Sequence, residues 1–284
     1  MKWGTPMSIG RDSIISLGGK LPPALGIFGR LRTLLDDADC DVETISDLIE
    51  VDPSLTFQVI RLSNSALYGL GTRCHTLDEA IGRIGFNEIH QLVGLVVARA
   101  AFQGDLALYG IPAGRLWENA VAVGALSSAF AARAGQNAGS SYSAGLMRNL
   151  GKVIFNNYTG GVQYPGEQAA PDLFAWEHQQ YGMNSAEAAA MLLDHWRFPL
   201  DISGAICSHH ALAAGTEFST GSALLHLACA HATAWGCGLP GEKSLWHQDA
   251  RTIEQAGIDP GLIDGAAIDA RQQFSRFAML EWSQ

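Results

Sequence analysis

The chain has 284 residues, of which 48% are hydrophobic and 16% are charged, so it is long and apolar enough to bury one large core or two smaller ones. Its 18 Lys and Arg residues stand against 28 Asp and Glu residues, which gives a formal net charge of −10. This charge opposes non-specific attraction to phosphate backbones and to anionic lipid, and so argues against nucleic acid and membrane surfaces as partners.

The apolar stretches are too short to cross a membrane. The run over residues 92–98 ends at Arg99, and the Ala-rich run over 120–132 contains two serines, whereas a span needs about 20 apolar residues. Arg11 and Asp12 interrupt the N-terminal stretch before it reaches the length of a signal peptide. The five cysteines are odd in number and show no Cys-x-x-Cys spacing, so neither a disulfide framework nor a structural zinc site is predicted. We therefore expect a cytoplasmic protein with reduced cysteines.

The first distinctive stretch along the chain is the acidic segment over residues 36–52. It holds eight acids and no base. The segment lacks the central glycine of the usual calcium-binding loop, and acids near helix N-termini are stabilised by the helix dipole. We therefore expect solvated helix ends and caps here rather than a metal site.

The next two helix starts can be read from their capping residues. Asp52 precedes Pro53, which places a capping carboxylate before a proline at the first helical position. Thr76 is followed three residues later by Glu79, which is the pattern of a capping box. The sequence therefore predicts one helix from Pro53 and a short second helix that ends near Gly85.

The segment over residues 87–102 shows the strongest helical periodicity. Its apolar residues recur at the i, i+3, i+4, i+7 spacing of a helix that is buried on one side. The buried side is predicted to carry Leu92, Val93 and Val96. No run of alternating β-branched residues bounded by turns competes with the helices, so the fold is predicted to be all-α.

The clearest break in composition lies at residues 109–114, where Pro112 is incompatible with a helix interior. Two helical lobes are expected on either side of it, packed together over an apolar seam. The predicted divisions are an N-terminal extension over 1–15, an N-terminal helical lobe over 16–108, and a second helical lobe with a C-terminal helical extension over 109–284.

Two later segments are predicted as loops from their glycines and prolines, over 159–171 and around 236–241. The tail from Gly241 onward is predicted to be helical and carries no distinguishing motif.

Several stretches together show a recognisable order of motifs. In the first half of the chain they are Leu21-Pro22-Pro23 ahead of a helix, "DLIEVDPSLTFQVIRLSNSALYG" and "LDEAIGRIGF". In the second half they are "LWEN", "AGLMRNLGKVIF", "YGMNSAEAAAMLLDHWRFP" and "ICSHH". This order resembles the HDOD family, all-helical regulatory modules of bacteria, over about residues 16–239. The resemblance implies a two-lobed helical fold of the HDOD, HD-like type.

HDOD modules are similar to the HD-domain phosphohydrolases, in which histidines and aspartates from several helices hold divalent metals that activate water. The resemblance can be followed position by position. Positions that would supply metal ligands in the metal-dependent relatives carry Asn119, the pair Arg148-Asn149, Ser185 and Cys229. Only His209 and His210 keep a ligand-type side chain, and an arginine at such a site repels a divalent cation. The resemblance therefore implies a chain with no catalytic residue, no bound metal and no cofactor.

Two interpretations of the remaining charged residues stay open. Arg148 and Lys152 are four residues apart and would share one helix face, where they would pair with local acids such as Glu118 or form a pocket for a small phosphate-containing ligand. His209 and His210 would be either a helix-end pair satisfied by backbone groups or additional donors to that ligand.

Three classes of function follow from these residues. The preferred one is a non-catalytic module of signal transduction that acts by binding signalling proteins or a small anion at the degenerate site. The first alternative is a metal-dependent HD-type phosphohydrolase with an atypical site, acting on cyclic dinucleotides or nucleotides. The second is a nucleotide or nucleic-acid binder that uses Arg148 and Lys152.

Overall fold

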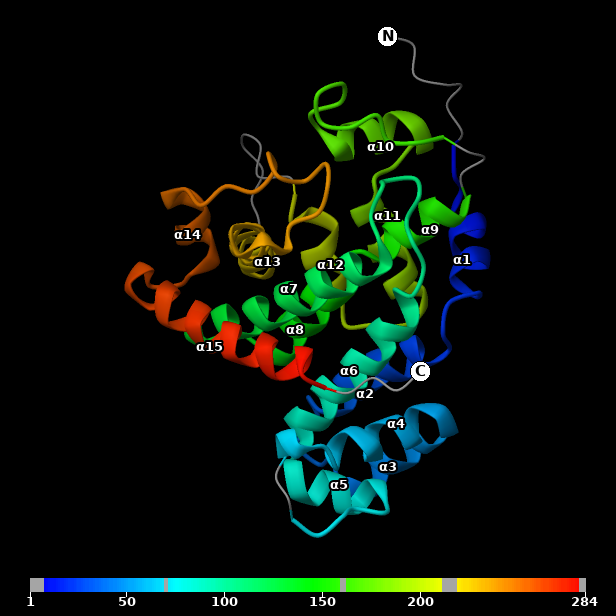
Figure 1. The fold of residues 1–284 in the computed structure, drawn as a ribbon, viewed down its shortest axis with the longest axis vertical. Helices are drawn as coiled ribbons and strands as arrows, with labels where there is room; N and C mark the ends of the chain where they lie inside the picture. Colours follow the sequence, from blue (N-terminus) through cyan, green and yellow to red (C-terminus); the bar gives the residue numbers. More distant parts are fainter. Residues whose placement is uncertain (1–7, 69–70, 159–161, 211–218, 281–284) are drawn as a thin grey trace.

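The structure is a computed structural model that describes residues 8–68, 71–158, 162–210 and 219–280 (Figure 1). In this part of the chain there is no β-strand, only an isolated bridge between Leu106 and Ile111, so the predicted all-α fold is confirmed. No helix among the same residues combines the length and the apolar character that a membrane crossing requires. The helices are α1 (Arg11–Gly18), α2 (Ala24–Leu34), α3 (Val42–Glu50), α4 (Pro53–Ser63), α5 (Leu77–Ile84), α6 (Phe86–Ala101), α7 (Ala113–Arg133), α8 (Ala138–Met147), α9 (Leu150–Tyr158), α10 (Leu173–Tyr181), α11 (Ser185–His195), α12 (Leu200–Ser208), α13 (Thr220–Ala232), α14 (Ala250–Ala256) and α15 (Pro260–Ala278).

The predicted helix starts are present. The side chain of Asp52 accepts hydrogen bonds from the N–H groups of Ser54 and Leu55, each at 3.0 Å, at the start of α4. Thr76 caps α5 by accepting from the N–H of Glu79 at 3.2 Å. In a full capping box the Glu79 carboxylate would accept from the N–H of Thr76 itself. It accepts instead from the N–H of His75 at 2.6 Å, so only the Thr76 half of the predicted capping box forms.

The acidic segment consists of helix ends and caps, as predicted. Asp41 accepts from the N–H of Thr44 at 2.8 Å and so caps α3. Asp36 forms an ion pair with Arg32 of α2. Among the described residues there is no group of three or more His, Cys, Asp or Glu side chains placed to hold a metal ion.

Helix α6 lies at the centre of the molecule (Figure 1). The predicted buried residues Leu92, Val93 and Val96 are 0%, 0% and 4% exposed. The expectation that only one side is buried is wrong, because Leu95 and Ala98 are also fully buried. The reason is that α2, α4, α5, α7 and α8 all pack against α6. Figure 1 shows α4 and α5 on one side of α6 and α7 and α8 on the other.

Aromatic rings join the helices on the two sides of α6. His90 of α6 is stacked on Phe28 of α2 with ring centroids 5.0 Å apart, and its ring is 5.8 Å from that of Tyr142 in α8. Phe28 in turn meets Phe198, which follows α11, at 6.1 Å. Helix α1 packs against α9 and α11 rather than against the helices that follow it directly. The boundaries at residues 15 and 108 stay a prediction.

Close approaches between helices position the residues discussed below. A Cβ atom added at Gly145 of α8 would lie 2.7 Å from the backbone oxygen of Val123 in α7. One added at Gly151 of α9 would lie 1.8 Å from the backbone oxygen of Ser185 in α11. Only glycine fits at such contacts, so α9 and α11 meet directly next to Lys152 and Ser185.

The predicted helical tail is confirmed from α14 onward, but the segment between α13 and α14 is not regular α-helix. Residues 233–237 form a short π-helical stretch in which Gly236 has a positive φ of 83°, as suits a glycine. Residues 242–249 then contain no α-helix before α14 begins. Two side chains of this segment, Glu242 and Trp246, are buried, whereas Lys243, Ser244 and His247 to Asp249 are exposed.

Candidate functional site

The centre of the site is a buried ion cluster of two cations and one carboxylate. Glu242, on the segment after α13, accepts hydrogen bonds from Arg148 Nη2 at 2.9 Å and from Arg148 Nη1 at 3.3 Å. Lys152 Nζ lies 2.8 Å from Glu242 Oε1. All three side chains are 1% exposed. A single carboxylate thus neutralises much of the charge of both cations inside the protein.

Two expectations about these cations are wrong. Arg148 and Lys152 do not share one helix face, because α8 ends at Met147, α9 begins at Leu150, and Arg148 lies in the turn between them. Glu118 is not their partner. It pairs with Arg115 at 2.9 Å instead, three residues earlier on the outer side of α7.

Asn119 accepts a hydrogen bond from the guanidinium, and Asn149 in turn donates to Asn119. Asn119 Oδ1 accepts from Arg148 Nη2 at 2.8 Å and from Asn149 Nδ2 at 3.0 Å. Asn119 Nδ2 donates to the backbone oxygen of Cys237 at 2.8 Å. Asn119 therefore ties the turn before α9 to the segment that carries Glu242.

A second buried carboxylate lies beside the cluster. Glu177 of α10 accepts from the hydroxyl of Tyr109 at 2.7 Å and from the N–H of Ser185 at 2.7 Å. The hydroxyl of Ser185 is 3.3 Å from Lys152 Nζ. Ser185 and Lys152 thus connect the two carboxylates through polar contacts.

The two carboxylates have opposite pKa shifts. Burial would raise the pKa of Glu242, but the charges and hydrogen bonds of Arg148 and Lys152 overcome this effect and lower its pKa to about 2. Burial raises the pKa of Glu177, and the charge of Lys152 and the hydrogen bonds to this carboxylate only partly oppose the rise. Glu242 is therefore the ionised partner of the cations.

The two histidines are neutral and stacked on aromatic rings. Burial, reinforced by the charge of Arg148, lowers the pKa of His209 well below its usual value, and His209 Nδ1 donates to the backbone oxygen of Ile206 at 2.7 Å. The ring of His209 is stacked on that of Trp246, with centroids 5.4 Å apart. Burial, with Lys152 nearby, lowers the pKa of His210 to about 4, and the ring of His210 is stacked on Phe174 at 4.2 Å.

Cys229 of α13 is the last predicted site residue, and it is a neutral thiol. Burial raises its pKa to about 12, although the charge of Arg148 opposes the rise. A metal ligand would have to be the thiolate, which this environment disfavours.

The side chains present do not fit a divalent metal ion. Of the two histidines, His209 is beside the guanidinium of Arg148 and His210 is near the ammonium of Lys152. Both oxygens of Glu242 are already held by cations. A metal ion placed here would meet two positive charges and displace the carboxylate from them.

The structure brings the predicted site residues into one buried region. These are Asn119, Arg148, Asn149, Lys152, Ser185, His209, His210 and Cys229. The sequence analysis missed Glu242, Glu177, Tyr109 and Trp246. The only signal for Glu242 was an acid in a loop that follows Pro240 and Gly241, and nothing there predicts burial. That the region binds a ligand stays a prediction.

A family model of the HDOD domain matches residues 21–212, more than half of the chain. The chain belongs to the HDOD family. A curated relative of this HDOD chain, an uncharacterized protein of Treponema pallidum (strain Nichols), is 26% identical over 189 residues. The match covers 64% of this chain and 36% of the relative, so the chain corresponds to about a third of that protein's length.

Solved structures show the same fold at low identity. An HDOD domain protein of unknown function from Geobacter sulfurreducens has a TM-score of 0.69 at 19% identity, covering 96% of this chain and 100% of the other. A candidate phosphohydrolase from Shewanella amazonensis SB2B has a TM-score of 0.68 at 22% identity, covering 94% and 98%. A candidate signal transduction protein from Marinobacter aquaeolei VT8 has a TM-score of 0.69 at 21% identity, covering 94% and 64%. The two-lobed HDOD fold expected from the motifs is confirmed.

Proposed function

We propose that this HDOD chain is a non-catalytic regulatory module of bacterial signal transduction, which acts in the cytoplasm by binding signalling proteins. The observation that carries the proposal is the buried cluster of Arg148, Glu242 and Lys152. It occupies the place where, by the resemblance to the HD-domain phosphohydrolases, metal ions would have to activate water.

The same cluster favours protein contacts over a small anion as the mode of action. Arg148 and Lys152 would hold a phosphate through charge-assisted hydrogen bonds, but Glu242 already accepts these bonds at 2.8 to 3.3 Å. An incoming anion would have to displace a carboxylate that is part of the chain and therefore always present. We therefore assign the two cations a structural role, the pairing with Glu242 inside the protein.

The phosphohydrolase alternative is tested with the purified chain. We expect less than one tenth of an equivalent of iron, manganese or zinc by elemental analysis, and no hydrolysis of bis(p-nitrophenyl) phosphate or of cyclic dinucleotides with added Mn²⁺ or Fe²⁺. A metal-dependent HD-type phosphodiesterase assayed in parallel is the positive control. About one metal per chain, with turnover that a chelator and His209→Ala both abolish, would overturn the proposal.

Calorimetry separates the two binding alternatives from the proposed function. Inorganic phosphate, mononucleotides and cyclic dinucleotides are titrated into the parent and into Arg148→Ala, and we expect no saturable binding to either. Affinity for single-stranded DNA that falls steeply with salt would support the nucleic-acid alternative, which the net charge of −10 opposes. Anion binding that Arg148→Ala removes would instead make the cluster a ligand site.

A further inference from the structure

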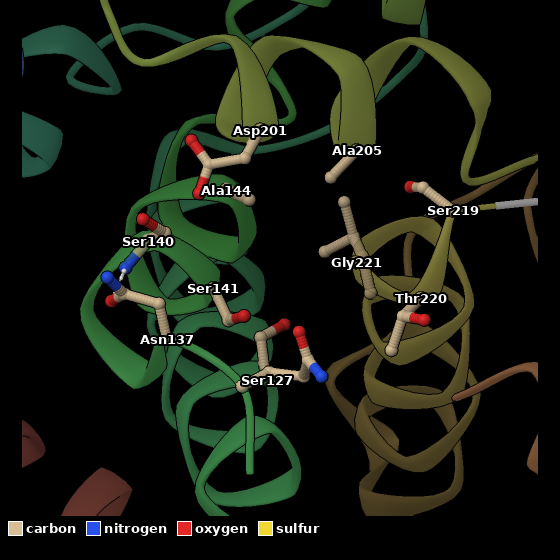
Figure 2. Close-up of a pocket in the computed structure, with 12 residues that line it drawn as sticks. Ser127, Asn137, Ser140, Ser141, Ala144, Asp201, Ala205, Ser219, Thr220 and Gly221 are labelled. Carbon is tan, nitrogen blue, oxygen red and sulfur yellow. Dashed lines mark hydrogen bonds between the residues drawn. The ribbon is translucent and has the colours of Figure 1, made fainter. Parts of the chain in front are cut away.

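A separate cavity lies in the second lobe, away from the ion cluster. It has a volume of about 250 Å³ and is enclosed by the C-terminal part of α7, the first turns of α8 and α13, and one side of α12 (Figure 2). None of the site residues described above lines it. Pockets for drug-sized ligands measure about 300 to 1,000 Å³, so this cavity suits a smaller molecule.

Two serines that line the cavity carry buried hydroxyl groups without partners, and that of Ser127 lies at its floor. Ser127 is 0% exposed and Ser140 is 5% exposed, and neither Oγ atom has a hydrogen-bond partner among the described residues. Figure 2 shows the Ser127 hydroxyl directed from α7 into the space between α8 and α13. A buried hydroxyl left unpaired costs free energy, and buried polar groups in proteins are almost always satisfied. The unpaired hydroxyl of Ser127 therefore indicates a polar molecule in the cavity.

The walls of the cavity differ in charge from one side to the other. Asp201, in the first turn of α12, places a carboxylate on the side of α8 (Figure 2). The opposite side is the N-terminus of α13, where the Ser219 side chain accepts from the N–H of Ser222 at 3.1 Å. The N–H groups of Thr220 and Gly221 then have no intrahelical partner, and the helix dipole makes this end positive. No Lys or Arg lines the cavity.

We propose that this cavity binds a small zwitterion that carries one ammonium and one carboxylate group, the chemistry of a free amino acid. Asp201 would hold the ammonium, the start of α13 would hold the carboxylate, and Ser127 would donate or accept a hydrogen bond at the floor. Ala144, Ala205 and Leu225 supply the apolar part of the wall. A doubly charged phosphate has no cationic side chain to meet here, and a flat ring has no aromatic side chain to stack on.

Calorimetry on the full chain tests the charge requirement. The probes are the free protein amino acids and the ω-amino acids from glycine to 5-aminopentanoate, which differ in the separation of their two charges. We expect at least one of them to bind saturably with one site per chain. The carboxamide and the N-acetyl form of that ligand should each bind at least tenfold more weakly, because each lacks one charge. Absence of binding at millimolar concentration of every probe, or equal binding of the neutralised forms, overturns the proposal.

Two substitutions place the ligand in this cavity. Asp201→Asn and Ser127→Ala should each weaken binding at least tenfold. Asp194→Asn, which changes an exposed acid outside the cavity, is the matched control and should bind as the parent does. Asp201 is exposed and Ser127→Ala removes a hydroxyl without a partner, so we expect both variants to melt no lower than the parent. Unchanged binding in both variants, or crystals with the zwitterion that hold only water in the cavity, would contradict the assignment.

Discussion

Glu242 is the residue on which the buried charges of this HDOD chain depend. Arg148 and Lys152 are both 1% exposed, and burying either cation without a partner would cost several kcal/mol. Oε2 of Glu242 accepts from Arg148, and Oε1 of Glu242 lies 2.8 Å from Nζ of Lys152. Asn119 supplies a further acceptor to Arg148. The chain's own side chains thus pair both charged groups, and among the described residues only Nε of Arg148 is left without an acceptor in this cluster of cations and carboxylate.

Replacing this carboxylate should therefore be costly. In Glu242→Gln the two cations remain buried while the negative charge is gone, and we expect a loss of about 3 to 5 kcal/mol in the free energy of unfolding, measured by urea denaturation. Glu118→Gln is the control, because its pair with Arg115 is partly exposed and should change stability by about 1 kcal/mol or less. Equal urea midpoints for Glu242→Gln and Glu118→Gln would show that the buried cluster contributes little to the free energy of unfolding.

The buried histidines predict how stability depends on pH. Burial, with the charge of Arg32 adding to it, lowers the pKa of His90 from 6.5 to about 3. The folded state keeps His90 neutral while the unfolded chain takes up a proton below pH 6.5. The contribution of His90 to stability is therefore complete above pH 6.5 and is lost as the pH falls toward 3, by up to about 1.4 kcal/mol per pH unit.

A substitution isolates this contribution. His90→Gln can keep a hydrogen bond to Ser143, whose hydroxyl is 3.2 Å from His90 Nε2, but has no group that titrates. We expect unfolding midpoints of His90→Gln to fall less between pH 7 and pH 4.5 than those of the parent. His195→Gln, at an exposed position, should keep the slope of the parent. If the unfolding midpoint of His90→Gln fell with pH as steeply as that of the parent, groups other than His90 would cause the acid sensitivity.

At the scale of single residues, the order of motifs located the site region but not its charge balance. Asn119, Arg148 and Ser185 could be placed from the HDOD resemblance because each stands in a quoted motif, and Cys229 from the helix in which the family carries a late aspartate. Glu242 could not be predicted as their partner. It is 94 residues from Arg148, at the start of a tail that the sequence analysis predicts to be helical, and nothing in that stretch predicts burial of its side chain.

At the scale of elements, the residues at which helices start were easier to predict than the faces of a helix that other helices bury. Asp52 and Thr76 act through hydrogen bonds within their own segments, so local sequence determines them. The two-sided burial of α6 depends on helices far along the chain. A periodic stripe identifies one buried face, but it does not show whether small and apolar residues on the other face, such as Leu95 and Ala98, are covered as well.

The burial of α6 predicts a strong effect of a charge inside it. Val96→Asp would place a carboxylate without a partner at a position that is 4% exposed, and we expect a loss of about 4 kcal/mol or more in the free energy of unfolding. Asn87→Asp introduces the same side chain at an exposed position of the same helix and should leave the melting temperature nearly unchanged. A similar melting temperature in Val96→Asp and the parent would contradict the packing described for α6.

At the scale of the whole molecule, α6 makes the two groups of helices depend on each other. Helices α2, α4 and α5 bury one part of its surface, and α7 and α8 bury another. The ring of His90 is stacked on that of Phe28 in α2 and meets that of Tyr142 in α8 edge-on. Loss of either group of helices would expose apolar surface of α6, so neither group is expected to unfold alone.

The positions of the tryptophans allow a direct test of this dependence. Tryptophan stands at positions 3, 117, 176, 196, 235, 246 and 282. None lies in the segment 16–108, and six of the seven lie in the segment 109–284, so fluorescence reports mainly on the second lobe. Leu77→Ala shortens a fully buried side chain of α5 and should destabilise its surroundings by about 2 to 5 kcal/mol. We expect urea unfolding of this variant, followed by tryptophan fluorescence and by far-ultraviolet circular dichroism, to shift to the same lower midpoint with both probes. A fluorescence midpoint that stays at the parental value, while circular dichroism shows an earlier transition, would mean that the lobes unfold independently.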